Sequence, residues 1–191
     1  MNTLFPIQQV FPDGFQYYDD FLSEDEELRL INDIARYDLY AMMFQGFEAK
    51  RKVQSFGHNY NFDTRKISKG KEIPNELLSL IQKVAEFLSI ALDEFQQVLV
   101  TEYPPGSVIN WHRDAPPFDI VVGVSLLSDC KFKLRPYDRE ARDGKKSVIT
   151  TTVKRRSLYI LKGEVRSDWE HSIAPVSETR YSITLRTLRK G

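Results

Sequence analysis

Two histidines and an aspartate form the first chemically suggestive set in this sequence. His112 and Asp114 are two positions apart, and His171 follows 59 positions after His112. Residues i and i+2 of an extended strand point to the same face, so His112 and Asp114 can reach one ion from a single strand end. Two histidines and one carboxylate are the ligands of a facial Fe(II) site. The spacing therefore suits an iron ion, and the alternative for either histidine is a hydrogen bond at the surface.

Two arginines follow the second histidine closely. Arg180 and Arg186 lie six positions apart, so on a strand they share one face. The planar guanidinium group matches a carboxylate through two hydrogen bonds, and a pair of such groups suits a small dicarboxylate beside the metal. Left unpaired inside a barrel, the two charges would be costly. The alternative is an exposed sheet face on which the arginines favour solubility.

The composition indicates one soluble globular domain. The chain has 191 residues, of which 41% are hydrophobic and 28% charged. No apolar run approaches the roughly 20 residues that span a bilayer, and the first residues lack the pattern of a signal peptide. Cys130 is the only cysteine, so any metal must bind histidine and carboxylate. We expect a cytoplasmic monomer that does not associate with membranes.

The charge is balanced overall but uneven along the chain. The 27 basic and 27 acidic residues cancel, which argues against a protein that packages nucleic acid by charge alone. The segment from Asp19 to Asp38 is acidic, whereas Lys131–Arg156 and Arg180–Lys190 are rich in lysine and arginine. A local basic groove therefore remains compatible with the neutral total, and an ordinary solvated surface is the alternative.

Two helices are predicted near the front of the chain. The first covers about Glu24 to Tyr37, because Ser23 and Glu26 form a capping box at its start. The second runs roughly from Pro74 to Leu92, with proline in the first turn. Apolar residues recur at helical spacing in both segments, namely Leu28, Leu30, Ile31 and Ile34 in the first and Leu77, Leu78, Ile81, Val84, Ala85 and Leu88 in the second.

After Glu94 the pattern changes to short strands separated by turn segments. Asp143-Gly144 is typical of a hairpin turn between two of them. The predicted strands are Gln97–Tyr103, Asp119–Leu127, Lys131–Arg135, Ser147–Val153, Ser157–Leu161 and Tyr181–Leu188. Helices followed by many short strands predict an α+β chain whose β core is a sandwich or jelly roll, with the helices packed on the outside of one sheet.

The motifs now assembled resemble the AlkB family of 2-oxoglutarate- and Fe(II)-dependent dioxygenases over about Gln97 to Arg189. The family has a tyrosine-x-x-glycine element nine residues before its first metal ligand, and a closing R-x-N-x-T-x-R pattern. The matching segments are His112-x-Asp114 with the later His171, Arg180-x-Ser182-x-Thr184-x-Arg186, Tyr103-Pro-Pro-Gly106 and Gly163-Glu164-x-Arg166. The family fold is a double-stranded β-helix, a jelly roll, so the resemblance implies the same core here.

The resemblance also implies roles for individual residues. His112, Asp114 and His171 would bind Fe(II). Arg180 would pair with the distal carboxylate of 2-oxoglutarate with help from the hydroxyl of Tyr103, and Arg186 would hold the end that chelates iron. This sequence departs from the family pattern at two positions of the co-substrate site, because Thr101 and Ser182 occupy positions at which the family often has asparagine.

The implied reaction consumes 2-oxoglutarate and dioxygen and hydroxylates a C–H bond of the substrate. An N-methyl group would then be lost as formaldehyde, so the expected substrate is alkylated DNA or RNA, in repair or RNA modification. The resemblance implies a single domain over residues 1–191, with a lid at roughly 41–66 and a jelly-roll core at roughly 97–189. Phe56, His58, Tyr60 and Phe62 alternate in that lid, so a strand would place them on one face.

Several residues are candidates for contact with the substrate. His58 or Tyr60 could stack on a base that has been flipped out, and the alternative is that these rings pack against the core. Trp111, Arg113 and Arg135 are further candidates, with a core position for Trp111 and solvent exposure for Arg135 as the alternatives. Two other functions stay open: the same oxygenase chemistry on a protein side chain or small molecule, and a jelly-roll module that binds metal without catalysis.

Overall fold

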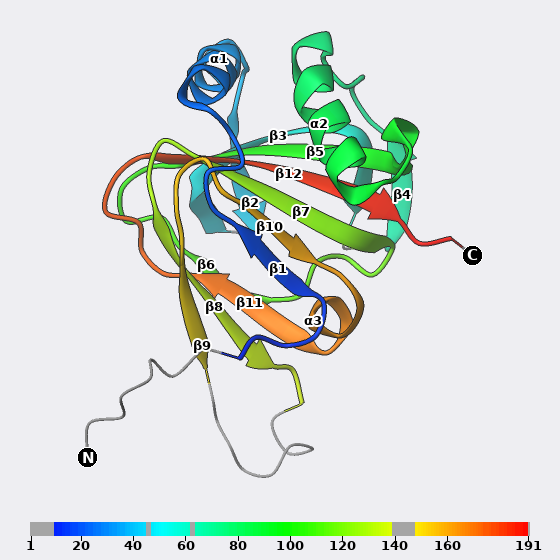
Figure 1. Cartoon of the computed structure of the whole chain (residues 1–191), viewed down its shortest axis with the longest axis vertical. Coiled ribbons are helices and arrows are strands. Elements are labelled where there is room, and N and C mark those ends of the chain that lie inside the picture. Colours follow the sequence, from blue (N-terminus) through cyan, green and yellow to red (C-terminus); the bar gives the residue numbers. More distant parts are fainter. Residues whose placement is uncertain (1–9, 45–46, 62–63, 139–147, 191) are drawn as a thin grey trace.

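Two β-sheets face each other in the computed structural model, and two helices cover the outer face of the larger one (Figure 1). The structure describes residues 10–44, 47–61, 64–138 and 148–190. The strands are β1 (Phe15–Tyr18), β2 (Tyr40–Phe44), β3 (Phe47–Asn61), β4 (Lys66–Lys69), β5 (Phe95–Tyr103), β6 (Ile109–His112), β7 (Phe118–Leu126), β8 (Cys130–Pro136), β9 (Ile149–Val153), β10 (Leu158–Leu161), β11 (Trp169–Ile173) and β12 (Arg180–Leu188).

The larger sheet has the strand order β1-β10-β7-β12-β5-β3-β2, with β4 paired to β3, and the smaller sheet has the order β6-β11-β8-β9. Neighbours in both sheets are antiparallel. This arrangement of two facing sheets confirms the predicted α+β double-stranded β-helix with helices on one sheet. All six predicted strands are present, with ends shifted by one or two residues. The predicted Asp143-Gly144 turn lies outside the described residues.

The first helix, α1 (Glu24–Ile34), begins as predicted and ends early. The Ser23 hydroxyl accepts a hydrogen bond from the Glu26 amide at 3.2 Å, and the Glu26 carboxylate accepts one from the Ser23 amide at 2.8 Å. The predicted end at Tyr37 is wrong, because the helix closes at Ala35. The predicted apolar face is wrong at Leu28, which is 59% exposed, whereas Glu27 is buried and pairs with Arg155.

The second predicted helix is divided into three pieces. A 3-10 turn, η1 (Asn75–Leu77), leads into α2 (Leu78–Leu88), and a second turn, η2 (Leu92–Glu94), follows. The continuous helix to Leu92 was wrong because Ser89 adopts a left-handed conformation, with φ of 55°, that ends α2. Leu78 is also largely exposed and lies outside the buried face.

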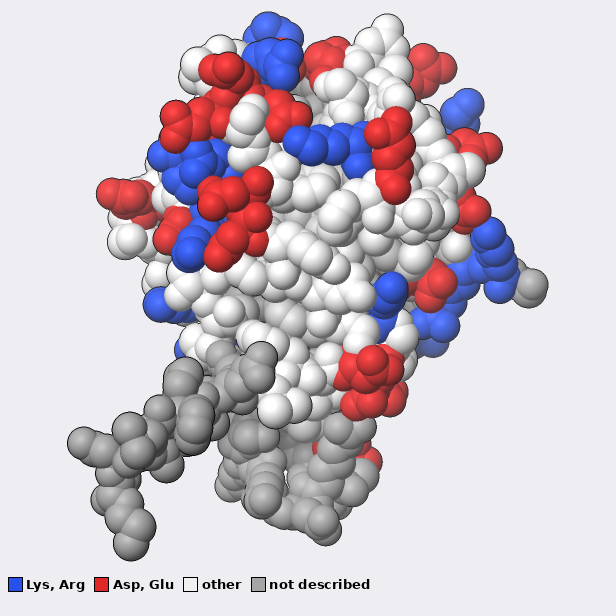
Figure 2. Space-filling model, viewed as in Figure 1, with Lys and Arg blue, Asp and Glu red and all other residues white. Residues whose placement is uncertain are grey.

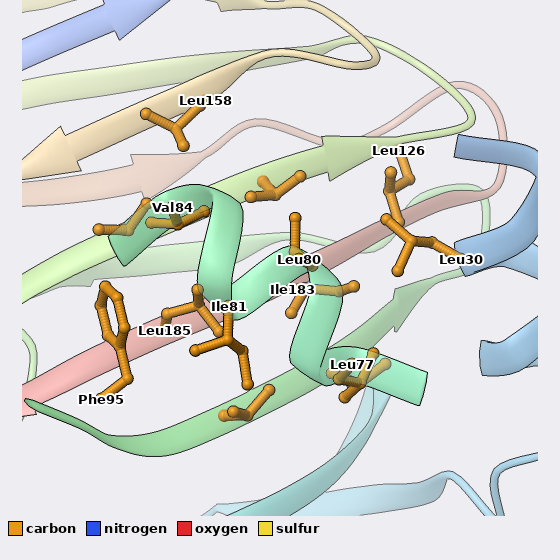
Figure 3. Close-up of a cluster of buried hydrophobic side chains, with 14 of the residues drawn as sticks. Leu30, Leu77, Leu80, Ile81, Val84, Phe95, Leu126, Leu158, Ile183 and Leu185 are labelled. Atoms are coloured by element: carbon orange, nitrogen blue, oxygen red, sulfur yellow. The ribbon is translucent and has the colours of Figure 1, made fainter. Parts of the chain in front are cut away.

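Two apolar layers flank the larger sheet. Residues of α1 and α2 pack on its outer face, where Leu80, Ile81 and Val84 lie over β12 and its neighbours (Figure 3). The second layer lies between the sheets and includes Tyr103, Phe132 and Tyr159. Alternation along the strands separates the layers, so Arg180 and Arg186 point to the side opposite Ile183 and Leu185. The inner layer therefore surrounds the predicted site.

Much of the uneven charge is neutralised by pairing across the fold. Acidic and basic side chains intermingle around α1 (Figure 2). The ion pairs there join Asp19 to Lys154, Glu27 to Arg155, and both Asp20 and Glu24 to Arg156. The acidic segment Asp19–Asp38 therefore neutralises the charge at the end of the predicted basic segment Lys131–Arg156. Among the described residues, no helix is long and apolar enough to cross a bilayer.

Candidate active site

Pairing between β6 and β11 brings the two histidines together. His112 lies directly opposite His171 in the antiparallel register, and their ring centroids are 4.2 Å apart. Asp114 follows the end of β6, and its Oδ2 is 3.6 Å from Nε2 of His171. His112 was expected at a strand end, but neither β6 nor β11 is among the six predicted strands, because β-branched residues are few in both segments. The cluster nevertheless joins residues 59 positions apart at one strand end.

Hydrogen bonding and burial prepare these side chains to bind a cation. His112 Nδ1 is 2.9 Å from the carbonyl oxygen of Asn110. Because that oxygen can only accept a hydrogen bond, Nδ1 carries the proton, and the unprotonated Nε2 can bind a metal through its lone pair. Burial lowers the pKa of His171 to about 3, which keeps its ring neutral. Burial opposes the charge of Asp114, but the guanidinium of Arg186 holds the pKa of the carboxyl well below its usual range.

The two oxygens of the Asp114 carboxylate lie in different environments. Oδ1 accepts hydrogen bonds from Nε and Nη2 of Arg186 at 3.0 and 2.7 Å, whereas the buried Oδ2 has no partner among the described residues. In that part of the chain, no three His, Cys, Asp or Glu side chains are gathered tightly enough to enclose an ion as they stand. Histidine nitrogens and a carboxylate oxygen are ligands that suit Fe(II), and the carboxylate oxygen without a hydrogen bond faces the second histidine.

Arg180 is fully buried between the sheets. Its Nε donates to the hydroxyl of Ser125 at 3.0 Å, and its guanidinium carbon lies 4.9 Å from the centre of the Tyr103 ring. Nη1 and Nη2 have no partner among the described residues. Burial opposes its charge, but Cys130, Tyr103 and Tyr159 raise the pKa of the guanidinium, so Arg180 stays charged. Two unpaired donors on a buried cation match the two oxygens of a carboxylate.

The other predicted co-substrate residues lie on the same strands. Arg180 is opposite Tyr103 and Ser182 is opposite Thr101 in the β12–β5 register, and all four are buried. Thr101 and Ser182 therefore share the inner face with the arginine, at the positions where the family often has asparagine.

Two residues contact the site without having been assigned a role from the sequence. Arg166, in the short helix α3 (Gly163–Ser167), donates through Nη2 to the carbonyl oxygens of Asp114, Ala115 and Phe118 at 3.2, 2.6 and 2.9 Å. Gln97 accepts a 2.7 Å hydrogen bond from Arg186. The resemblance pointed to the segment of Arg166, whereas only cross-strand register reveals Gln97.

The predicted substrate contacts on the smaller sheet already have partners within the chain. Arg135 lies over the Trp111 ring at 4.2 Å and pairs with Glu170 at 2.6 Å. Arg113 lies over the ring of Tyr137 at 3.6 Å and donates to the Ser167 carbonyl. These arginines flank the metal-binding candidates, but a substrate would have to share them with intramolecular contacts.

The predicted common face of four lid aromatics is wrong. Gly57 has a φ of 78°, which breaks the strand alternation between Phe56 and His58. Phe56 is buried against Tyr37 in the outer core, whereas His58 and Tyr60 are half-buried. Phe62 lies outside the described residues. His58 and Tyr60 thus stay as candidates, and Phe56 does not.

Most of the chain, including the candidate site, matches a known protein family. The model of the 2OG-Fe(II) oxygenase superfamily matches residues 14–189, which covers both sheets and the candidate site. The chain belongs to the 2OG-Fe(II) oxygenase superfamily. It is an AlkB-like dioxygenase whose cofactors are Fe(II), 2-oxoglutarate and dioxygen, as the resemblance implied. The reading as a jelly-roll module without catalysis is therefore set aside.

Three curated relatives are about a quarter identical to this oxygenase over the aligned residues. The Arabidopsis thaliana "Alkylated DNA repair protein ALKBH8 homolog" is 27% identical over 74% of the chain and 50% of its own length. The Mus musculus "tRNA (carboxymethyluridine(34)-5-O)-methyltransferase ALKBH8" is 24% identical over 87% of the chain, which spans 25% of that protein. The Caenorhabditis elegans "DNA N6-methyl adenine demethylase" is 24% identical over 93% of the chain and 61% of its length.

Solved structures share the fold of this oxygenase. The structure of OsALKBH1 superposes with a TM-score of 0.66 at 17% identity, over 95% of the chain and all of that structure. A Pseudomonas putida prolyl-4-hydroxylase superposes with a TM-score of 0.61 at 14% identity, over 93% and 94%. The jelly roll is therefore shared by oxygenases with different names, and the fold alone does not select a substrate.

Proposed function

We propose that this oxygenase oxidatively removes alkyl groups from nucleobases in DNA or RNA. Fe(II) would be held by His112, Asp114 and His171. The observation that carries the assignment is the pairing of His112 opposite His171, with the unpartnered Oδ2 of Asp114 3.6 Å from the second ring. Two imidazole nitrogens and a carboxylate oxygen supply three ligands on one side of an ion, which leaves the other side to co-substrates and substrate.

The neighbouring arginines would hold 2-oxoglutarate. Arg180 presents two donors without hydrogen bonds at a buried position and suits the distal carboxylate, with Tyr103 beside it. Arg186 already binds one carboxylate, that of Asp114, and would orient the end of the co-substrate nearest the metal. Thr101 and Ser182 line the strand face between these two arginines and would offer their hydroxyls as hydrogen-bond partners.

The bound metal and 2-oxoglutarate would supply an oxidant that hydroxylates a substrate C–H bond. The chain's own groups would orient that bond and exclude water. Arg186 keeps Asp114 ionised, Arg166 fixes the backbone that carries Asp114, and burial keeps His171 unprotonated. These residues maintain the ligand set, while the lid would place the alkylated base.

Nucleic acid is supported as the substrate by the relatives' names and by local charge. From residue 47 to residue 71 the sequence has seven lysines and arginines but only Glu48 and Asp63 as acids, in a chain that is neutral overall. Six of these cations are exposed along β3, β4 and their flanks: Lys50, Lys52, Arg65, Lys66, Lys69 and Lys71. His58 is paired with Lys69 across the β3–β4 ladder, so a half-buried ring and a cation share one face.

A turnover screen tests the proposal. Succinate formation would be measured with methylated DNA and RNA oligonucleotides, methylated peptides and small molecules, each against its unmethylated counterpart. We expect stimulation by at least one methylated oligonucleotide and loss of turnover in His112→Ala and Asp114→Ala. Asp25→Ala, an exposed position on α1, is the matched control. Stimulation by peptides or small molecules alone would support the alternative substrate class instead.

A further inference from the structure

We propose that Gln97 is a positioning residue that couples the lid strand β3 to the metal and co-substrate centre. The inference rests on the proposed assignment of Asp114 and Arg186 to that centre. Gln97 lies on β5, between β3 and β12, and is 6% exposed. Gly57 and Arg186 are its direct partners on the two neighbouring strands. The three residues therefore form one line across the larger sheet.

Both ends of the Gln97 amide are used, each by a different neighbour. Its Oε1 accepts a 2.7 Å hydrogen bond from Nη1 of Arg186, and its Nε2 donates a 2.7 Å hydrogen bond to the carbonyl oxygen of His58 and a longer one, of 3.4 Å, to the Ser55 hydroxyl, also on β3. Arginine can only donate and a carbonyl can only accept, so the orientation of the amide is fixed by its partners. A side chain with only one of these functions cannot make both bonds.

The local backbone of β3 turns at Gly57, next to this bridge. Gly57 is the last residue of β3 that pairs with β5, and from His58 onward β3 pairs with β4. The φ of 78° at Gly57 turns the strand at this point, and a Cβ there would lie 2.3 Å from the Gln96 carbonyl oxygen. A side chain at position 57 would therefore collide with the backbone of β5, and the turn at Gly57 places the first carbonyl of the lid hairpin within hydrogen-bond distance of Gln97.

A continuous chain of contacts results. It runs from Asp114 through Arg186 and Gln97 to the His58 carbonyl, with each bond in the chain 3.0 Å or shorter. Because Gln97 and Asp114 are buried, water competes little for these bonds. Filling the centre fixes Arg186, and Gln97 transmits that restraint to β3. Lid order thereby depends on whether metal and co-substrate are bound.

Hydrogen exchange tests this coupling with the full chain. Exchange of the amides from Ser55 to Asn61 would be followed with and without Mn(II) plus N-oxalylglycine, an unreactive analogue of 2-oxoglutarate. In the wild type we expect these amides to exchange roughly tenfold more slowly when the pair is bound, the effect that one net hydrogen bond supplies. Binding itself would be measured separately by calorimetry.

Two variants separate the halves of the bridge. Gln97→Glu keeps an acceptor for Arg186 but loses the donor to His58, and Gln97→Leu loses both. We expect Gln97→Glu to bind the pair with an affinity within a few-fold of the wild type and to lose the slowed exchange. Its KM for a nucleic-acid substrate should rise while its KM for 2-oxoglutarate stays the same. Gln97→Leu should lose the lid response and bind the pair more weakly.

The outcomes test the coupling separately from the site assignment on which it rests. If the wild type binds the pair and lid exchange does not change, or if Gln97→Glu retains the full response, the coupling is wrong while the site stands. If the wild type does not bind Mn(II) and N-oxalylglycine, the site assignment fails, and the coupling fails with it. Unfolding of Gln97→Leu would be detected by thermal melting, and Gln97→Glu then provides the decisive comparison.

Discussion

At the scale of single residues, the candidate site is defined by polar groups whose partners are incomplete. Arg180 has two unpartnered donors and Asp114 one unpartnered oxygen, both buried among the described residues. Buried polar groups are almost always paired in folded proteins, so such exceptions call for an explanation. A cation at Asp114 and a carboxylate at Arg180 would satisfy both. The same two groups were singled out by residue type and spacing, and the resemblance to the AlkB family then implied their roles.

Gln97 and Arg166 show where residue-level prediction ends. A glutamine in a strand and an arginine in a short helix have no distinctive spacing relative to the metal-binding candidates. Their importance comes from the partners that register and loop geometry bring to them, Arg186 for Gln97 and three backbone carbonyls for Arg166. The register between neighbouring strands cannot be predicted from a single sequence.

The unpaired charge of Arg180 predicts a separation of stability from co-substrate binding. Arg180→Met removes a buried charge whose partner is missing, so the free energy of unfolding without co-substrate should stay the same or rise by roughly 1 kcal/mol. The stabilisation that 2-oxoglutarate and Mn(II) give the wild type should be lost. Thermal melting with and without the two ligands measures both effects. Strong destabilisation of the ligand-free variant would show that the charge is already paired.

Lysine at the same position tests the geometry of the interaction. Arg180→Lys keeps the charge but loses the planar fork that two carboxylate oxygens can accept. We expect the dissociation constant of N-oxalylglycine to rise at least about tenfold, in line with about 1.5 kcal/mol for a charge-assisted hydrogen bond. Lys133→Arg, on the smaller sheet, is a control for the change of cation type. Unchanged affinity in Arg180→Lys would place the carboxylate elsewhere.

At the scale of elements, local signals fixed the starts of helices and the strands rich in β-branched residues. The capping box at Ser23 is present as predicted, and the six strands predicted after Glu94 are found. Helix ends were predicted poorly, since Ser89 in a left-handed conformation and the closure of α1 at Ala35 depend on packing. β6 and β11, which carry the histidines, were missed because polar residues interrupt their apolar ones and β-branched residues are few.

The capping box gives a prediction with a pH dependence. Lys83, then the Ser23 amide, lowers the pKa of Glu26 below its ordinary 4.5. A carboxyl whose pKa falls on folding contributes stability above its unfolded pKa and loses it as pH falls through the folded pKa. Glu26→Gln should therefore be less stable than the wild type at pH 7, and the difference should shrink below pH 4.5. Urea denaturation at several pH values measures this; a difference that is constant with pH would contradict it.

At the scale of the whole molecule, a neutral chain places opposite charges in different regions. Acidic residues near α1 pair with Lys154, Arg155 and Arg156, which neutralises that side of the fold. The β3–β4 hairpin keeps an excess of exposed cations. Net charge alone therefore hides this uneven distribution, and the fold shows which basic residues are already paired.

Charge reversal on the hairpin tests that distribution. Lys69→Glu should weaken binding of a single-stranded oligonucleotide and reduce the steepness of its salt dependence, because fewer counterions are released. Arg29→Glu, an equal change of charge on exposed α1, should have a smaller effect. Fluorescence anisotropy at several salt concentrations gives both quantities. Equal losses in the two variants would indicate that only net charge matters.

The central claim is that one site, made by His112, Asp114 and His171 with Arg180 and Arg186 beside them, binds the metal and 2-oxoglutarate together. The most direct test is a crystal grown with Mn(II) and 2-oxoglutarate and measured for anomalous scattering from the metal. We predict one anomalous peak in contact with all three metal-binding candidates, and 2-oxoglutarate with its distal carboxylate on Arg180. A metal peak that lacks His171 or Asp114 as a ligand, or a co-substrate that does not reach Arg180, would contradict the account.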